Sequence, residues 1–210
     1  MSRGLFITFE GIDGCGKTTQ IAALSQFFTN AHKEVVLTRE PGGCSIAETI
    51  REVILSTDSK LGDRGELMLY LAARAEHVDQ VIIPALEHHK IVISDRFYDA
   101  TFAYQGFGRG LDTNLITTLN DIAISGCHPD VTILLDIDVD SAYSRRDTRG
   151  KPDRLEQSGR EFFERTREGY LTIARENPHR FIVVDATHSI EVVSQTILSA
   201  LKEKYNAIFA

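Results

Sequence analysis

The sequence contains few cysteines and no long apolar segment. Cys15, Cys44 and Cys127 are far apart and show no metal-binding spacing, which favours reduced thiols in a cytoplasmic protein. No apolar run reaches the roughly 18 residues needed to cross a bilayer, and residues 1–4 do not begin a secretory signal pattern. We therefore expect a cytoplasmic protein without membrane partners.

An excess of positive charge is missing as well. The 210 residues carry a net charge of −7, with 42% hydrophobic and 25% charged residues. These fractions are ordinary for a globular protein, but an acidic chain is a poor general binder of nucleic acid. The sequence shows no repeat, linker or low-complexity segment, so we predict one domain over residues 1–210 that does not bind nucleic acid.

Short apolar segments alternate with longer helical patterns along the chain. The apolar segments predict five strands, at residues 5–7 with 9, 35–37, 91–93, 131–135 and 181–184. Helical periodicity predicts helices over residues 18–28, 46–55, 66–88 with a kink at Pro84, 114–125, 141–146, 161–176 and 190–205. This alternation is typical of an α/β fold with a parallel sheet between helices. Residues 105–112 and 147–157 are predicted to be loops.

The segment after the first predicted strand matches the phosphate-binding pattern G-x-x-x-x-G-K-[ST], the P-loop. Its glycines let successive backbone N–H groups face phosphate oxygens, and the following helix directs its positive end at the anion. Lys17 is expected to reach the β- and γ-phosphates, and the Thr18 hydroxyl to bind Mg²⁺. The predicted ATP-binding residues here are Gly11, Ile12, Asp13, Gly14, Cys15, Gly16, Lys17, Thr18 and Thr19.

The P-loop alone does not distinguish a kinase from a GTPase or an ATP-driven machine. The sequence has no Asn-Lys-x-Asp motif for reading guanine, and 210 residues are few for most mechanical ATPases. A small-molecule kinase is the simplest interpretation. A regulatory module that binds ATP without transferring phosphate is the alternative from a different class.

Further segments match one family in order along nearly the whole chain. They are residues 38–43 (Thr-Arg-Glu-Pro-Gly-Gly), 70–74 (Tyr-Leu-Ala-Ala-Arg), 95–97 (Asp-Arg-Phe), 104–106 (Tyr-Gln-Gly) and 145–156, which ends in Asp-Arg-Leu-Glu. The chain thus resembles the thymidylate kinases. The resemblance implies a P-loop nucleoside monophosphate kinase with a five-stranded parallel sheet, helices on both faces and an arginine-rich lid at about residues 145–157.

The same resemblance implies a reaction and its partners. The γ-phosphoryl of ATP would be transferred to dTMP, giving dTDP and ADP, with Mg²⁺ as cofactor and a homodimer as the assembly. Another pyrimidine nucleotide kinase or a deoxynucleoside kinase is the alternative within the class. The choice of base would depend on Tyr70 and Arg74, which lie one helical turn apart and share a face.

The resemblance also assigns residues to the acceptor. Arg39 would hold its phosphate, Tyr70 and Arg74 its pyrimidine, and Tyr104 would lie against its sugar. Tyr70 stands where the family has phenylalanine, and Ala100 where a serine is common. The substrate-binding residues implied in this way are Asp13, Arg39, Tyr70, Arg74, Arg96, Thr101, Tyr104 and Gln105.

Catalysis would depend on positive charge around the transferred phosphoryl. The catalytic residues implied by the resemblance are Lys17, Arg96, Arg149, Asp13 and Asp95. Arg96 would neutralise phosphate charge, and Asp95 would order Mg²⁺ together with Thr18.

A glycine in the P-loop bears on which segment supplies a further catalytic arginine. Some relatives carry a catalytic arginine at the position of Gly14, so in this chain the lid would supply it. Arg149 is the leading candidate, with Arg146 and Arg154 as supporting ATP-side residues.

We predict that Arg149→Ala lowers kcat far more than it lowers the affinity for dTMP. The physical reason is that a lid arginine would act on charge that develops during transfer rather than on the bound acceptor. Steady-state kinetics with dTMP varied at saturating ATP measure both effects. An unchanged kcat would remove Arg149 from the catalytic role.

Overall fold

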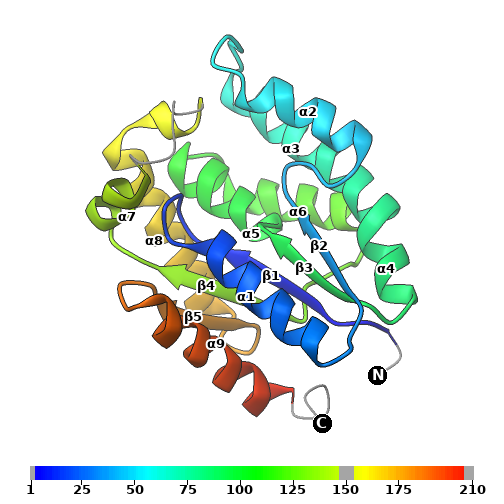
Figure 1. Cartoon of the computed structure of the whole chain (residues 1–210). Helices are drawn as coiled ribbons and strands as arrows, with labels where there is room; N and C mark the ends of the chain where they lie inside the picture. The colour runs from blue at the N-terminus through cyan, green and yellow to red at the C-terminus, as the bar shows by residue number, and fades with distance from the viewer. Residues whose placement is uncertain (1–2, 147–153, 206–210) are drawn as a thin grey trace.

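A single five-stranded parallel sheet forms the centre of the computed structural model, which describes residues 3–146 and 154–205 (Figure 1). The strand order is β2-β3-β1-β4-β5, and all four neighbouring pairs are parallel. The strands are β1 (Phe6–Glu10), β2 (Val35–Arg39), β3 (Ile91–Asp95), β4 (Val131–Asp136) and β5 (Phe181–Asp185). The predicted α/β class and all five predicted strands are confirmed.

Helices connect these strands and cover both faces of the sheet (Figure 1). In chain order they are α1 (Lys17–Asn30), α2 (Ser45–Leu55), α3 (Asp63–His77), η1 (Val78–Ile82), α4 (Ile83–Glu87), α5 (Tyr98–Thr101), η2 (Phe102–Gly108), α6 (Thr113–Ile124), α7 (Val139–Arg146), η3 (Glu156–Ser158), α8 (Arg160–Glu176) and α9 (Ile190–Lys204). None of them is both long and apolar enough to span a membrane, within the part of the chain that the structure describes.

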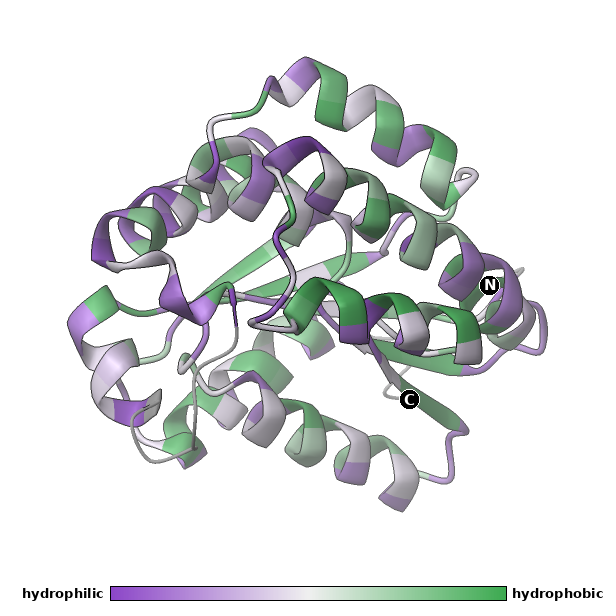
Figure 2. Cartoon of the chain, turned by 90° about the horizontal axis from the view of Figure 1, so that it is seen from above, coloured by the Kyte–Doolittle hydropathy of each residue, from purple (hydrophilic) through white to green (hydrophobic). Residues whose placement is uncertain are grey.

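The central strands are apolar because both of their faces are buried. Ile7 and Phe9 of β1 join a core cluster with α1, α8 and α9, whereas Phe6 packs in a second cluster with η1 and α4. Phe6 pairs in register with Val92 of β3, and Ile7 with Val131 of β4. Figure 2 shows the largely hydrophobic strands lying between the helices. Burial on two faces produces the continuous apolar runs seen in the sequence.

The helix predicted over residues 66–88 is real, but its hydrogen-bonding pattern changes partway. It is helical from Asp63 to Glu87, with a π-helical turn over Val78–Ile82. Pro84 lies two residues after this turn, in the first turn of α4, where a missing N–H costs little. The predicted interruption at Pro84 is therefore a local widening of the helix.

The loop predicted over residues 105–112 is wrong in its first half. That part belongs to η2, a π-helical segment that continues α5 as far as Gly108. The glycines there and opposite allow η2 to approach α8 closely. An added Cβ would lie 2.6 Å from the Phe162 ring at Gly108, and 2.9 Å from the Phe107 side chain at Gly169. Close helix packing, rather than chain flexibility, explains these glycines.

Candidate active site

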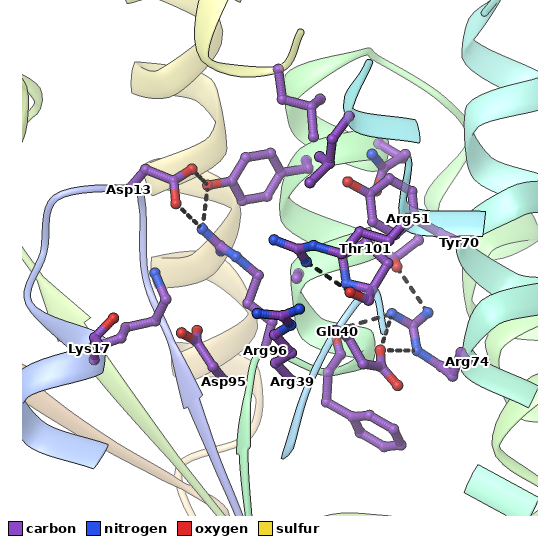
Figure 3. Close-up of a pocket in the computed structure, with 18 of the residues that line it drawn as sticks. Asp13, Lys17, Arg39, Glu40, Arg51, Tyr70, Arg74, Asp95, Arg96 and Thr101 are labelled. Carbon is purple, nitrogen blue, oxygen red and sulfur yellow. Dashed lines mark hydrogen bonds and ion pairs between the residues drawn. The ribbon is translucent and has the colours of Figure 1, made fainter. Parts of the chain in front are cut away.

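A pocket opens at the carboxyl ends of β1, β2 and β3, the edge of an open parallel sheet where ligands bind (Figure 3). Its polar lining comes from the P-loop, from the ends of β2 and β3, and from α2, α3, α5 and η2. Those polar residues are Asp13, Lys17, Thr18, Arg39, Glu40, Arg51, Tyr70, Arg74, Asp95, Arg96, Thr101, Tyr104 and Gln105. The structure thus brings together most of the site residues predicted from the sequence.

The P-loop joins β1 to α1 in a conformation that favours glycine. Gly11, Gly14 and Gly16 have φ values of 134°, 95° and 100°, and α1 begins directly after Gly16. The buried ammonium of Lys17 donates to the carbonyl oxygen of Gly11 over 3.1 Å. Lys17 and the start of α1 therefore direct positive charge at one edge of the pocket, as phosphate binding requires.

Three other P-loop residues pack against the protein interior rather than projecting a side chain into the pocket. The side chains of Ile12 and Cys15 are buried in the main core cluster, so they face away from the pocket. Burial raises the pKa of the Cys15 thiol, although Lys17 opposes this. Gly14 lies against α7, and a Cβ there would collide with the carbonyl oxygen of Ala142. This loop has no room for a side chain at position 14.

Arg96, directly after β3, connects several parts of the site. One guanidinium nitrogen, Nη1, donates to the carbonyl oxygen of Gly11 over 2.9 Å and to the Tyr170 hydroxyl over 3.0 Å. The other, Nη2, donates to the Asp13 carboxylate over 2.6 Å and to the Tyr104 hydroxyl over 3.0 Å. The charge of Arg96 is thereby fixed at the junction of the P-loop and the acceptor side.

The ionisation of Asp13 follows from the same contacts. Burial alone would raise its pKa, but Arg96 and then Lys17 outweigh this and hold the pKa of Asp13 well below its usual range. The Tyr104 hydroxyl also donates to Asp13, over 3.0 Å. Burial raises the pKa of Tyr104, so this donor stays protonated. Asp13 is therefore a fixed negative charge beside a fixed positive one.

The backbone of Arg96 is held in an unusual conformation. Its φ of 72° lies in the left-handed region, which is uncommon for a residue with a side chain. Ser94 Oγ donates to the Arg96 carbonyl oxygen over 2.7 Å, and the next N–H, of Phe97, donates to Glu10 over 2.7 Å. Tyr170 donates to the other oxygen of Glu10, also over 2.7 Å. Buried Glu10 therefore supports both the backbone and a side-chain partner of Arg96.

Glu10 was not predicted from the sequence as a site residue. It is fully buried, and this burial, with a smaller contribution from Asp99, raises its pKa to about 8 although Arg96 acts in the opposite direction. A charged residue in an otherwise apolar strand was the available sequence signal, because such a side chain needs a partner.

Arg74 of α3 lies in the pocket wall but is engaged by the protein. Its guanidinium pairs with Glu40 at 2.7 Å and donates to Thr101 over 2.9 Å, Asn120 over 2.7 Å and the Phe97 carbonyl oxygen over 3.3 Å. The resemblance implied donation from Arg74 to the pyrimidine. In this structure its N–H groups are directed at protein acceptors, because a buried guanidinium must be satisfied locally.

The other acceptor-side residues are less enclosed. Arg39 is exposed and pairs with Glu48 at 3.0 Å, and Tyr70 is half-buried against the core. Arg51 of α2 was missed from the sequence, yet it lines the pocket and donates to the Pro41 carbonyl oxygen over 2.7 Å. It shares a helix face with two buried residues, Ala47 and Ile54, and a charge on an apolar face was the signal.

Asp95 and Thr18 fit the predicted magnesium site in part. Asp95 Oδ1 is buried and has no hydrogen-bond partner among residues 3–146 and 154–205, and both residues line the pocket. An unsatisfied carboxylate oxygen beside the P-loop is suited to a hard cation or its water. The described residues contain no group of three or more potential metal ligands, so phosphates and water would complete the coordination.

Of the three predicted lid arginines, only the side chain of Arg154 lies within the described residues. Arg149 lies outside the described residues, and so does the side chain of Arg146. Arg154 was expected on the ATP side, but its guanidinium lies 2.6 Å from Glu66 of α3 and donates to the Ile54 carbonyl oxygen of α2. The buried Glu66 carboxylate needs a cation, and Arg154 supplies one beside α2 and α3.

The fold and the pocket together define a P-loop kinase. The P-loop and Lys17 line the same pocket as three arginines, which come from β2, α2 and the end of β3. Two anion sites that share one charged junction are the arrangement that phosphoryl transfer requires.

Comparison with known proteins identifies the family. The family model described as thymidylate kinase matches residues 9–197. The thymidylate kinase of Kosmotoga olearia is 43% identical over 194 residues, covering 92% of this chain and 93% of the relative. That of Trichlorobacter lovleyi is 48% identical over 204 residues, covering 94% and 96%. The chain belongs to the thymidylate kinase family, whose members are nucleoside monophosphate kinases.

A solved structure agrees with this assignment. The crystal structure of thymidylate kinase from Ehrlichia chaffeensis superposes with a TM-score of 0.79 at 39% sequence identity. The match covers 95% of this chain and 98% of that one. The predicted family and P-loop kinase fold are thereby confirmed.

We predict that Glu10 makes stability fall as pH rises from about 5 to 8. Its folded-state pKa of about 8 lies above the ordinary value of 4.5, so over this range the folded protein holds a proton that the unfolded chain has released. The free energy of unfolding of the wild type, relative to Glu10→Gln, should drop by up to about 1.4 kcal/mol per pH unit. Urea unfolding at pH 5, 6, 7 and 8 measures the difference; a pH-independent difference would show that Glu10 is ionised when folded.

Proposed function

We propose that this chain catalyses ATP + dTMP → ADP + dTDP as a single domain. The observation that carries the proposal is the shared pocket, in which Lys17 and the P-loop lie on one side and Arg39 and Arg51 on the other, with Arg96 between them. Family membership names the acceptor: the relatives are thymidylate kinases. A cytoplasmic location remains a prediction from the cysteine usage.

The protein would act mainly by positioning and by neutralising charge. A 5′-phosphate oxygen of dTMP attacks the γ-phosphorus of ATP, the bond from that phosphorus to the β,γ-bridging oxygen breaks, and ADP leaves with the electron pair. No strong general base is needed, because a phosphate monoester with a second pKa of about 6 is largely ionised at neutral pH. Lys17 and Arg96 would stabilise the charge on the transferred group.

The acceptor-side residues would orient dTMP. Arg39 and Arg51 supply charge for its phosphate, and the ring of Tyr70 can stack on the pyrimidine. The pair of Asp13 and Tyr104, fixed by Arg96, would lie against the sugar. Thr101 and Gln105 are buried in the wall on the same side, where they shape the pocket for the nucleoside.

Mg²⁺ would be held by Asp95, directly or through water, and by the Thr18 hydroxyl. The support is the unsatisfied Oδ1 of Asp95 beside the P-loop. When bound, the ion would neutralise phosphate charge. The contribution of Arg149, with Arg146, remains a prediction of the resemblance.

A panel of acceptors tests the proposed function. With ATP and Mg²⁺, we expect dTMP to be phosphorylated with a kcat/KM about a hundredfold or more above those of CMP, UMP and thymidine. A coupled ADP assay measures each rate, and Lys17→Gln, prepared in parallel, reports any contaminating kinase. A higher kcat/KM with CMP, UMP or a nucleoside would show that dTMP is not the preferred acceptor. ATP binding without turnover on any acceptor would indicate a regulatory module.

We also propose a homodimer formed through α2, α3 and α6. These neighbouring helices carry exposed apolar side chains, namely Ile46, Val53, Met68, Leu115 and Ile122. Apolar residues gathered on adjacent helices are typical of an interaction surface.

Sedimentation velocity tests the dimer. We expect twice the chain mass for the wild type and a shift to the monomer for Met68→Glu, because the substitution places a charge within the apolar surface. Val192→Glu, an equally apolar and exposed position on α9, is the matched control and should leave the mass unchanged. A monomeric wild type, or an equal shift in both variants, contradicts the proposed interface.

A further inference from the structure

A buried carboxylate in α3 links two segments that are far apart in the sequence. Glu66 is fully buried and accepts from Gln105 Nε2 over 2.7 Å, from Arg109 Nη2 over 3.1 Å and from Arg154 Nη2 over 2.6 Å. We call these four residues the Glu66 cluster. Glu66 is not itself part of the pocket lining.

The charges of the Glu66 cluster are balanced by one further residue. Two guanidinium groups face one buried carboxylate, and Asp63 lies 3.6 Å from Arg109. Burial would raise the pKa of Glu66, but the hydrogen bonds from Gln105 and Arg109 and the charge of Arg109 outweigh it, so the pKa is lowered. An ionised carboxylate in this position needs at least one cationic partner, because an unpaired buried charge is costly.

Two of the three donors belong to walls of the acceptor pocket. Gln105 lines the pocket directly. Arg154 is followed by Leu155, which also lines it, and the backbone N–H and Nε of Arg154 donate to the carbonyl oxygens of Leu55 and Ile54 over 3.3 and 2.9 Å. One carboxylate therefore holds the wall formed by η2 and the wall formed by the end of α2 with Leu155.

The third donor provides an internal comparison. Arg109 binds the same carboxylate, but its guanidinium lies 4.7 Å from the ring of Phe162 in α8, and Arg109 does not line the pocket. Loss of either arginine removes a positive charge from Glu66. Only the loss of Arg154 also releases a pocket wall.

We infer that Glu66 is a positioning residue for the acceptor: by binding Gln105 and Arg154 together, it fixes the separation of two pocket walls and so sets the affinity for the nucleoside monophosphate. The inference rests on the proposed function in taking this pocket as the acceptor site. It assigns Arg154 to the acceptor, not to ATP. Geometry of this kind acts on binding more than on the transfer step.

Two matched variants, Arg154→Gln and Arg109→Gln, test the inference by steady-state kinetics. Arg154→Gln should raise the KM for the acceptor about tenfold, with kcat and the KM for ATP changed less than about threefold. Arg109→Gln should change the acceptor KM less than about threefold. Equal effects of the two variants, or a rise in the KM for ATP instead, would overturn the inference.

Glu66→Gln and the double variant Glu66→Gln/Arg154→Gln measure whether the two residues act on the acceptor KM together. If the two residues act as one unit, the double variant should raise the acceptor KM no more than the larger single effect. Arg154→Lys keeps the ion pair but lacks the Nε–H that reaches Ile54, and an intermediate KM is expected. Additive effects of the two substitutions contradict a shared role. Thermal unfolding of each variant identifies loss of the fold, and if Glu66→Gln does not fold, the two arginine variants still decide.

The two proposals fail in different ways. The variants are compared with whichever monophosphate the wild type phosphorylates, so another acceptor would refute dTMP and leave the Glu66 test intact. If the wild type phosphorylates none, calorimetric binding of dTMP to the wild type and both arginine variants replaces KM. Equal binding by Arg154→Gln and Arg109→Gln would then overturn the inference.

Discussion

The guanidinium of Arg96 joins three parts of the fold at one point, and the site depends on that junction. It contacts the P-loop through Gly11 and Asp13, η2 through Tyr104, and α8 through Tyr170. A left-handed backbone conformation typically costs a residue with a side chain about 1 kcal/mol or more. The surrounding hydrogen bonds offset that cost, and in return the donor and acceptor sides of the pocket share one fixed charge.

The wall near the expected base position is built from polar groups that satisfy one another. His77 is fully buried, lies 3.0 Å from Glu40 and 2.6 Å from the Thr38 hydroxyl, and Glu40 in turn pairs with Arg74. A satisfied buried network is rigid, because moving any member leaves another without a partner. If this wall receives the acceptor, as proposed, its rigidity reduces the ordering needed on binding.

The sequence was sufficient to predict the features that depend on residues close together in the chain. Continuous apolar strands predicted the parallel sheet, and the spacing of glycines with Lys17 predicted the P-loop. Two of the unpredicted residues are charged groups whose partners are distant in sequence: Glu10 meets Tyr170, and Glu66 meets Arg154. Gly108 of η2 was misread as a loop residue because the local pattern does not show that α8 packs against it. The contact of Arg154 with Glu66 could not be foreseen for the same reason.

The contact between Gly14 and Ala142 ties the choice of catalytic arginine to a helix outside the pocket. A loop arginine at this position, which the resemblance implies for some relatives, would need space that α7 takes up in this chain. A single substitution at position 14 would push the loop away from α7 before its new charge reached a phosphate. An arginine introduced at position 14 of this chain would therefore also require α7 or the loop to shift.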